Sequence, residues 1–303
     1  MLDPIVLGHN PFFGVDHLSS ARGNEKSKQF ENPGRILDVI RFCHELGAGG
    51  MMMSTHPRSA EVCGLLDKER AIAQTWRVYP LVPYIQKYVR GANEKGLINM
   101  VFGILSQASL GQKISLMFRG GKGLIGRDVW EALGLLLDVE LLPFRKLRMG
   151  TVFLHDALTD LALGLELDSV LLFFRDHVEK KYGTRAGLAT KNLPLLRERL
   201  SRMGWQDAVV MASFNAAGFL MNPGRESCAQ AMQEPGIDFM AMNTLASGHL
   251  APDEAYRYLA QFPLVRSVVV GVSRREHARE TFESIRRHLF PGEIHRIAKV
   301  TGT

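Results

Sequence analysis

Short apolar runs alternate with longer amphipathic segments along this chain, and the alternation recurs eight times. The runs are continuously apolar, which is typical of strands buried on both faces of a parallel sheet. The segments between them carry apolar residues at helical spacing, as Ile36, Val39 and Ile40 do. The expected strands span residues 5–8, 49–54, 77–83, 151–155, 185–190, 208–213, 237–242 and 267–272.

Eight strand-and-helix units predict an α/β fold of the (β/α)8 TIM-barrel type rather than an open sheet. A barrel of this kind commonly forms from one domain of this length, so we expect a single domain over residues 1–303. A doubly wound sheet would need a glycine-rich turn after its first strand. The turn at residues 8–14 lacks the G-x-G-x-x-G pattern of such sheets.

One connection is much longer than the others. Residues 84–149 separate the third and fourth strands and contain expected helices near residues 93–108 and 127–138. Long insertions are commonly lids over a site or surfaces for association. We therefore expect this segment either to cover the active site or to form the contact of a homo-oligomer.

Composition excludes several classes of function. The net charge is +6, but the basic residues are scattered and do not alternate with aromatic ones, so we expect no nucleic-acid partner. The sequence starts without a secretory signal, and no apolar stretch is long enough to span a membrane. The three cysteines lack metal-ligand spacing and fit reduced thiols. These features favour a cytoplasmic enzyme with a small-molecule substrate.

Polar residues follow most of the apolar runs directly. The active sites of (β/α)8 barrels lie at the carboxyl ends of the strands, so these residues are the candidate site. We expect the catalytic residues to be His155, His56, Asp156 and Lys191, and the substrate- or anion-binding residues to be Ser273, Arg274, Arg275, Asn10, Asn215, Asn243 and Tyr84.

The histidines after the first, second and fourth strands admit three interpretations. His9, His56 and His155 could together bind a divalent metal such as zinc, iron or manganese. His155, with Asp156, could instead act as a general acid or base. The third interpretation is that these side chains only complete the hydrogen bonding of the barrel rim.

Two further features concern charge. Lys191 could form a Schiff base if burial lowered its pKa, or it could be an ordinary solvated lysine. Ser273, Arg274 and Arg275 lie where the last strand meets the last helix. A helix N-terminus there would attract a phosphate or carboxylate, although the arginines could also be plain surface residues.

Several stretches, in their order along the chain, resemble the aldo-keto reductase family. Residues 45–56 and 61–66 are similar to its second strand and following helix, and residues 153–155 to its fourth strand, which ends in the catalytic histidine. The other similar stretches are residues 184–192, 243–250 and 268–281, which correspond to the fifth strand, the seventh loop and the final strand with its phosphate-binding helix.

The family reduces carbonyl groups with NADPH by means of an aspartate, a tyrosine, a lysine and a histidine. The aspartate position falls here on Ser54 and the tyrosine position near Ser59. The third strand has no lysine at its end, with Lys87 the nearest, and the asparagine of the last helix is Thr281. Only the histidine, His155, is kept. The resemblance therefore implies a shared fold and an altered chemistry.

We expect a small-molecule enzyme with a histidine-based metal or acid–base site, acting on an anionic or phosphorylated substrate as a lyase, isomerase, hydrolase or metal-dependent enzyme. The first alternative is an NADPH-dependent oxidoreductase in which Tyr84 replaces the lost acid. The second is a non-catalytic binding or regulatory subunit with residues 84–149 as its partner surface. On this sequence a divalent metal ranks ahead of NADPH as the cofactor.

Overall fold

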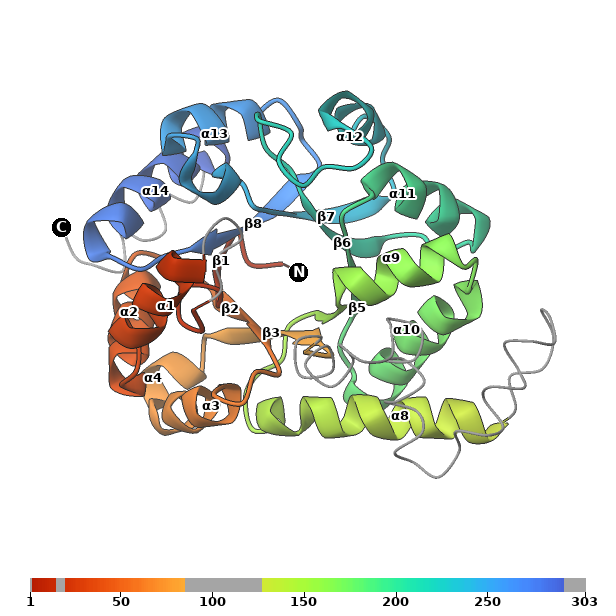
Figure 1. Ribbon diagram of the computed structural model, residues 1–303, viewed down its shortest axis with the longest axis horizontal. Helices are drawn as coiled ribbons and strands as arrows, with labels where there is room; N and C mark the ends of the chain where they lie inside the picture. Colours follow the sequence, from red (N-terminus) through yellow and green to blue (C-terminus); the bar gives the residue numbers. More distant parts are fainter. Residues whose placement is uncertain (1, 15–19, 85–126, 292–303) are drawn as a thin grey trace.

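The computed structural model describes residues 2–14, 20–84 and 127–291 (Figure 1). Eight parallel strands close into a barrel in chain order, with β8 paired to β1. The (β/α)8 fold expected from the sequence is confirmed. The strands are β1 (Ile5–Gly8), β2 (Gly50–Ser54), β3 (Arg77–Val82), β4 (Val152–Leu154), β5 (Ala186–Thr190), β6 (Ala208–Ser213), β7 (Ile237–Met242) and β8 (Val265–Gly271).

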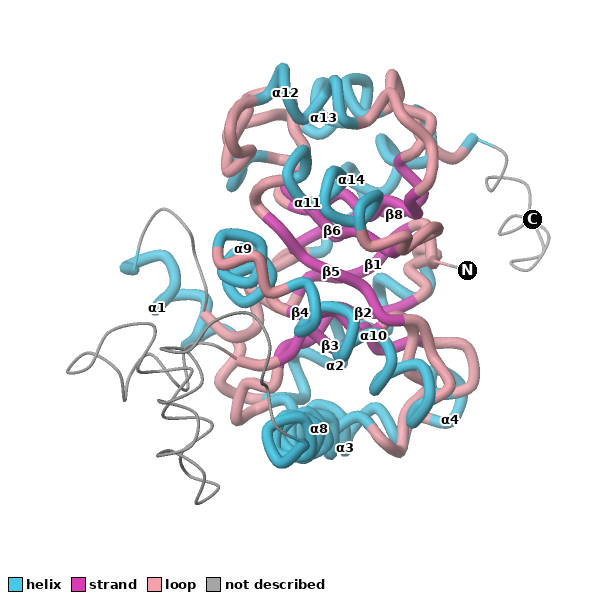
Figure 2. Tube along the Cα trace, turned by 90° about the vertical axis from the view of Figure 1, so that its right-hand side faces the viewer, coloured by secondary structure: helices cyan, strands magenta, loops and turns pink. Residues whose placement is uncertain are grey.

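Helices surround the barrel and follow the strands in alternation (Figures 1 and 2). No helix in the described part of the chain is both long and apolar enough to cross a membrane. The helices are α1 (Ser20–Gln29), α2 (Pro33–Glu45), α3 (Ser59–Lys68), α4 (Arg70–Ala73), α8 (Arg127–Leu141), α9 (Asp156–Gly164), α10 (Asp168–Tyr182), α11 (Leu193–Arg202), α12 (Arg225–Ala231), α13 (Pro252–Leu259) and α14 (Arg275–His288), with short 3-10 turns η1 (Leu142–Phe144) and η2 (Ala246–Gly248).

The segment between β4 and β5 forms two helices, although its apolar spacing is that of one. The apolar pattern over residues 160–182 predicts a single helix, but α9 begins earlier, at Asp156, and ends at Gly164. A turn with Glu166 at φ 55° separates it from α10. A positive φ of this kind cannot continue a right-handed helix. Periodicity alone missed the break because the apolar residues continue on both sides of it.

Two apolar clusters hold the barrel together. The larger one lies between the strands and the helices, and the smaller one fills the barrel interior. Strand β2 shows how alternation divides them: Met52 points inward, whereas Met51 and Met53 pack against the helices. The adjacent methionines of this strand therefore belong to two different cores.

Large and small residues interdigitate inside the barrel. A Cβ added at Gly150 would lie 2.6 Å from the ring of Tyr79, and one at Gly187 would lie 2.6 Å from the ring of Phe153. Both distances are too short for a real contact, so the aromatic rings occupy the space that glycine leaves. This packing fills the barrel interior at its amino-terminal end.

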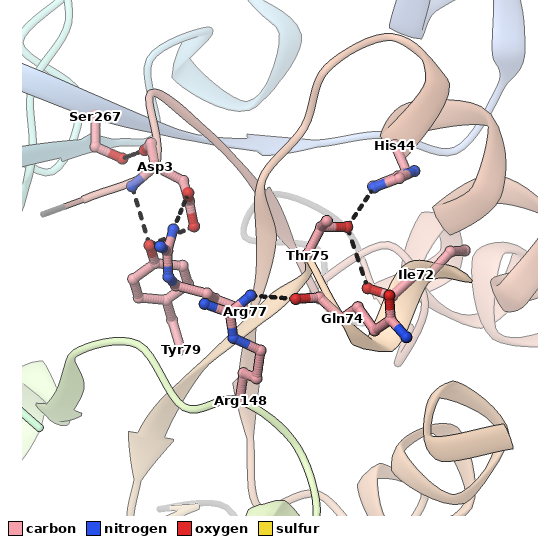
Figure 3. Close-up of polar contacts among 9 residues, drawn as sticks. All are labelled: Asp3, His44, Ile72, Gln74, Thr75, Arg77, Tyr79, Arg148 and Ser267. Atoms are coloured by element: carbon pink, nitrogen blue, oxygen red, sulfur yellow. Dashed lines mark hydrogen bonds and ion pairs between the residues drawn. The ribbon is translucent and has the colours of Figure 1, made fainter. Parts of the chain in front are cut away.

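A polar network closes the amino-terminal end of the barrel (Figure 3). The Tyr79 hydroxyl donates to Asp3 Oδ2 at 2.6 Å and accepts from the Asp3 N–H at 3.0 Å. Arg77 forms an ion pair with the same carboxylate, and Ser267 donates to the Asp3 carbonyl at 2.6 Å. Burial, together with the negative Asp3, raises the pKa of Tyr79. The N-terminal segment is thereby tied to β3 and β8.

The described part of the long insertion is an ordinary barrel helix. Helix α8 packs against β3, and its Asp138 accepts from Tyr182 at 2.7 Å and contacts His177 at 3.0 Å on α10 (Figure 1). Burial would raise the pKa of Asp138, but bonds from Lys181, Tyr182 and His177 outweigh it and lower the pKa to about 2. Residues 127–149 thus form part of the barrel wall, not a lid.

The remaining expectations for the insertion stay predictions. The expected helix near residues 93–108 and Lys87 lie outside the described residues. Leu135, Val139 and Leu142 form an exposed apolar row along α8 and η1, with Leu135 65% exposed. The row is compatible with an association surface, but nothing in the described chain lies against it.

Replacing Tyr79 with phenylalanine should lower the free energy of unfolding by about 1–3 kcal/mol, because a buried carboxylate loses a hydrogen-bond donor. Chemical denaturation measures the difference. The matched control is Tyr256→Phe, since the buried Tyr256 hydroxyl lies 3.2 Å from a neutral group, the Thr244 hydroxyl, and no carboxylate of the described residues bonds to it. That variant should lose less stability. Equal losses would contradict the role assigned to the Asp3 network.

Candidate active site

A cavity of about 850 Å³ opens at the carboxyl end of the barrel. This volume is in the range of small-molecule sites. The cavity begins over the barrel interior and continues past the β7 loop to α14. Its floor, here called the cavity floor, consists of the inward residues at the strand ends: Met52, Ser54, Leu81, Ala189, Met211, Met242 and Val269.

Seven of the residues expected in the site line this cavity. They come from five different strand ends, which only barrel closure brings to one mouth. The seven are His9, Asn10, Tyr84, His155, Asp156, Lys191 and Asn243.

His155, Asp156 and Lys191 form a chain of polar contacts across the ends of β4 and β5. The Nδ1 atom of His155 lies 2.6 Å from Asp156 Oδ1, and the Lys191 Nζ lies 3.3 Å from Asp156 Oδ2. One carboxylate therefore bridges an imidazole and an ammonium group. The chain forms locally because His155 is the N-cap of α9 and Asp156 its first residue.

The Nδ1 atom of His155 lies near both a donor, the Ala157 N–H, and an acceptor, Asp156 Oδ1, and the contact with the acceptor is the shorter, at 2.6 Å. The Ala157 N–H lies 3.0 Å from Asp156 Oδ1 and 3.2 Å from His155 Nδ1. An ionised carboxylate accepts both from this N–H and from a protonated Nδ1, whereas an unprotonated Nδ1 would face Asp156 with no proton between them. We therefore place a proton on Nδ1, which leaves Nε2 as the nitrogen that exchanges protons with a ligand.

Asp156 is ionised in this arrangement. Its side chain is only 13% exposed, and burial by itself would raise its pKa. The hydrogen bond and charge of His155 and the charge of Lys191 outweigh burial and lower the pKa well below its ordinary value. Asp156 is thus a fixed negative charge that holds two cationic or donor groups in place.

Asp160, one turn along α9, supports the same strand end. It accepts from the Thr190 hydroxyl and, at 3.1 Å, from the Lys191 N–H. Burial raises the pKa of Asp160, and the negative charge of Asp156 raises it further, against those hydrogen bonds. This residue fixes the backbone from which Lys191 extends, and the sequence reading did not single it out.

The other two histidines belong to a row of rings at the ends of β1 to β3. Phe13 contacts the His9 ring at 5.5 Å and stacks on the His56 ring at 4.5 Å between centroids. His56 in turn contacts Tyr84 edge to face at 5.1 Å. His9 and Tyr84 face the cavity, whereas His56 does not line it.

The expected metal centre at His9, His56 and His155 is not supported. A phenylalanine ring packs against both His9 and His56, and His155 is engaged with Asp156. Within residues 2–14, 20–84 and 127–291, no three histidine, cysteine, aspartate or glutamate side chains are arranged to bind a metal. Strand order predicted that the three histidines share one end of the barrel, but not that an aromatic ring fills the space between two of them.

Tyr84 is positioned by its backbone. Its N–H lies 3.1 Å from the Thr55 hydroxyl and 3.3 Å from Oε2 of Glu140, which also accepts from Thr55. Glu140 is 3% exposed and comes from α8. A buried acid of the long connection thus fixes the end of β3, a role that sequence spacing gave no sign of.

The two asparagines after β6 and β7 have different places. The Asn215 side chain donates to the Phe219 carbonyl and accepts from the Phe219 N–H, both at 2.9 Å, so it shapes its own loop and does not line the cavity. Asn243 donates to the Ser213 hydroxyl at 2.8 Å and lines the cavity. The substrate-binding prediction is geometrically compatible with Asn243 but not with Asn215.

Ser273, Arg274 and Arg275 lie at the start of α14, beside the cavity rather than in its lining. The Ser273 carbonyl accepts from the Gln29 amide of α1 at 2.9 Å. The Arg275 guanidinium packs over the Phe42 ring of α2 at 5.2 Å. Arg274 is the exposed N-cap and makes no side-chain capping bond. Of the two arginines, Arg275 packs on an aromatic ring and Arg274 has no such contact described.

Sequence reasoning missed several residues of the cavity. His277, Glu280 and Thr281 line it from α14, and His249 lines it from the β7 loop. Spacing offered a signal for the first three, because residues three and four apart share one face of a helix. No signal in the sequence indicated which face of α14 meets the cavity.

Solved structures with similar architecture were found by comparison. A protein of Pseudomonas aeruginosa assigned as an aldo-keto reductase matches with a TM-score of 0.59 and 16% identity, over 94% of this chain and 90% of that one. The holo form of an aldo-keto reductase from Bacillus halodurans matches with a TM-score of 0.54 and 12% identity, over 98% and 91%. A structure described as a 2,5-diketo-D-gluconic acid reductase B matches with a TM-score of 0.53 and 11% identity, over 98% of this chain and 86% of that one.

The barrel has the aldo-keto reductase fold. No family model and no curated protein matches the sequence, and identities this low show the fold alone. The positions where this barrel departs from the aldo-keto reductases are visible in the structure. Ser59 is buried and donates to the Ser54 carbonyl at 2.6 Å, so it cannot serve as the missing acid.

Replacing Asp156 with asparagine should lower the free energy of unfolding at pH 7 by about 1–3 kcal/mol, because charged hydrogen bonds are lost. The folded-state pKa of Asp156 is depressed, so its contribution is complete above the ordinary value of 3.8 and disappears as the pH falls toward the folded value. Denaturation curves at several pH values should therefore show the two proteins converging below about pH 4.

The matched control for this prediction is Asp176→Asn on α10. Asp176 also pairs with basic groups, Arg175 and Lys180, but its side chain is 43% exposed. Solvent screens such pairs, and the change should be much smaller. A gap between wild type and the Asp156 variant that stays constant from neutral to acidic pH would contradict the assigned charge state.

Proposed function

We propose that this protein is an oxidoreductase that interconverts a carbonyl compound and an alcohol with a nicotinamide cofactor, and that His155 transfers the proton. The observation that carries the proposal is the His155–Asp156–Lys191 chain, which lines a cavity that extends to His277 on α14. The fold shared with the aldo-keto reductases supports the redox alternative over the metal-dependent one.

The cavity suits a dinucleotide in two respects. It is elongated, reaching from the barrel mouth to His277, Glu280 and Thr281 on α14. Beside it, the N-terminus of α14 has no side-chain cap, and N–H groups of this kind bind phosphate. In this proposal, Arg274 and the first turn of α14 hold a phosphate, and the nicotinamide end lies over the barrel mouth. When bound, the reduced cofactor would supply the hydride.

His155 takes the place of the missing tyrosine. Its Nδ1 proton is held by Asp156, so Nε2 is the position that can exchange a proton with a ligand oxygen in the cavity. In reduction, a protonated Nε2 donates to the carbonyl oxygen as the carbon accepts hydride. In oxidation, the unprotonated Nε2 accepts the hydroxyl proton as hydride leaves the carbon. Proton transfer of this kind needs geometry first and a matched pKa second.

Lys191 and Asp156 prepare the imidazole. The Lys191 ammonium lies 3.3 Å from the carboxylate and helps to keep it ionised, and the carboxylate fixes the His155 ring through Nδ1. Lys191 is in this role a positioning group, not a Schiff-base lysine, because its ammonium is paired with a carboxylate.

Titration with NADPH should show micromolar binding by the change in cofactor fluorescence. His155→Gln should leave that binding unchanged and lower kcat/KM for aldehydes by about 10²–10⁴-fold, since an acid–base group is lost. NADPH oxidation with a panel of aldehydes measures turnover. Tyr84→Phe is the competing test. Loss of turnover in Tyr84→Phe with retention in His155→Gln would assign the acid to Tyr84, and absence of NADPH binding would refute the oxidoreductase.

The two arginines at α14 provide a matched pair. Arg274→Ala should weaken NADPH binding by about tenfold, as expected for loss of one charge-assisted phosphate contact. Arg275→Ala should leave the affinity nearly unchanged, because its guanidinium packs on Phe42. Equal effects of the two substitutions would contradict a phosphate contact specific to Arg274.

A further inference from the structure

Ser54 occupies an unusual position at the end of β2. The residue is 2% exposed and lines the cavity, and its Oγ atom has no hydrogen-bond partner among the described residues. A buried hydroxyl without a partner costs free energy, so such groups call for an explanation. The neighbouring hydroxyl offers none, because Ser59 donates to the Ser54 carbonyl instead.

Location separates Ser54 from the other unpartnered hydroxyls in the described chain. Thr159 and Ser284 are also buried without partners, but they lie in α9 and α14 and do not line the cavity. Strand alternation places Ser54 on the inward face of β2, two residues after Met52. Of these three residues, Ser54 is therefore the one that borders the cavity.

The surroundings of Ser54 are apolar and rich in thioethers. Met52, Met211 and Met242 form much of the cavity floor. Methionine side chains adapt to ligand shape and make favourable contacts with aromatic rings. No cationic side chain belongs to the cavity floor, and Lys191 above it is paired with Asp156. A carboxylate or phosphate seated there would be a buried charge without a partner.

We propose that the cavity floor binds an aromatic ring carrying one hydroxyl group, with that hydroxyl hydrogen-bonded to Ser54 Oγ. The ring contacts the three methionines, and Ser54 supplies the single polar contact that orients it. This inference rests on the proposed function. If the protein interconverts a carbonyl compound and an alcohol, its substrate is a hydroxyaryl carbonyl compound or the corresponding alcohol. Ser54 is then a specificity-determining residue.

The test uses phenol and toluene, which differ by a hydroxyl in place of a methyl group. Protein labelled with methyl-¹³C methionine is titrated with each probe, and the methyl signals of Met52, Met211 and Met242 are assigned by single Met→Leu variants. Both probes should shift these three signals. The ratio of the toluene to the phenol dissociation constant is then compared between wild type and Ser54→Ala.

The ratio should be about fivefold higher in wild type than in Ser54→Ala, as expected for one neutral hydrogen bond. Comparing ratios cancels the different hydration of the probes. Ser284→Ala is the matched control, because it removes a buried unpartnered hydroxyl away from the cavity, and its ratio should equal that of wild type. Neither substitution should lower the Tm, since each removes a group without a partner.

An equal ratio in wild type and Ser54→Ala would overturn the proposal and assign the hydroxyl to bound water. If phenol shifted the methyl signals of other methionines only, or shifted no methionine signal up to its solubility, the proposal would be overturned as well. These measurements need neither cofactor nor turnover. A higher ratio in wild type than in Ser54→Ala, without NADPH binding, would therefore support the hydroxyaryl site and refute the oxidoreductase. NADPH binding with equal ratios would support the oxidoreductase and refute the hydroxyaryl site.

Discussion

Pairing of the first strand with the last is the constraint on which this molecule depends. Ile5 to Gly8 pair in register with Val268 to Gly271, and this contact converts a row of strands into a closed sheet. Closure places His9 beside the loop that leads into α14, although more than 260 residues separate them in the chain. Without it the cavity would have no wall between the barrel mouth and α14.

The two ends of the closed barrel differ in packing and in polarity. At the amino-terminal end, aromatic rings pack over glycines inside the barrel. The Asp3–Tyr79 hydrogen bonds link the N-terminal segment to β3 at the same end (Figure 3). At the carboxyl end, the inward residues are methionines and small side chains, and a cavity remains. Two carboxyl groups with shifted pKa values, Asp156 and Asp160, lie at that open end. Stability and ligand binding thus use opposite ends of one sheet.

The sequence predicted the strands well because burial on both faces leaves a continuous apolar signal. The end of each apolar run also marks where polar residues follow a strand. The sequence therefore indicated His155, Asp156 and Lys191 as candidate site residues. It could not predict how these side chains meet: the His56 ring stacks on Phe13, Asn215 bonds within its own loop, and Arg275 packs on Phe42. Each of those outcomes depends on a neighbour from another element.

The amino-acid sequence by itself determined the fold class, the order of the strands and the set of polar residues at their carboxyl ends, because hydrophobic periodicity is a local property of the chain. Only the tertiary structure decided that Asp156 bridges His155 and Lys191, that the described histidines form no metal site, and that Ser54 lines the cavity with no hydrogen-bond partner in the described chain. These facts are set by distances between side chains of different strands, which are fixed only when the sheet closes.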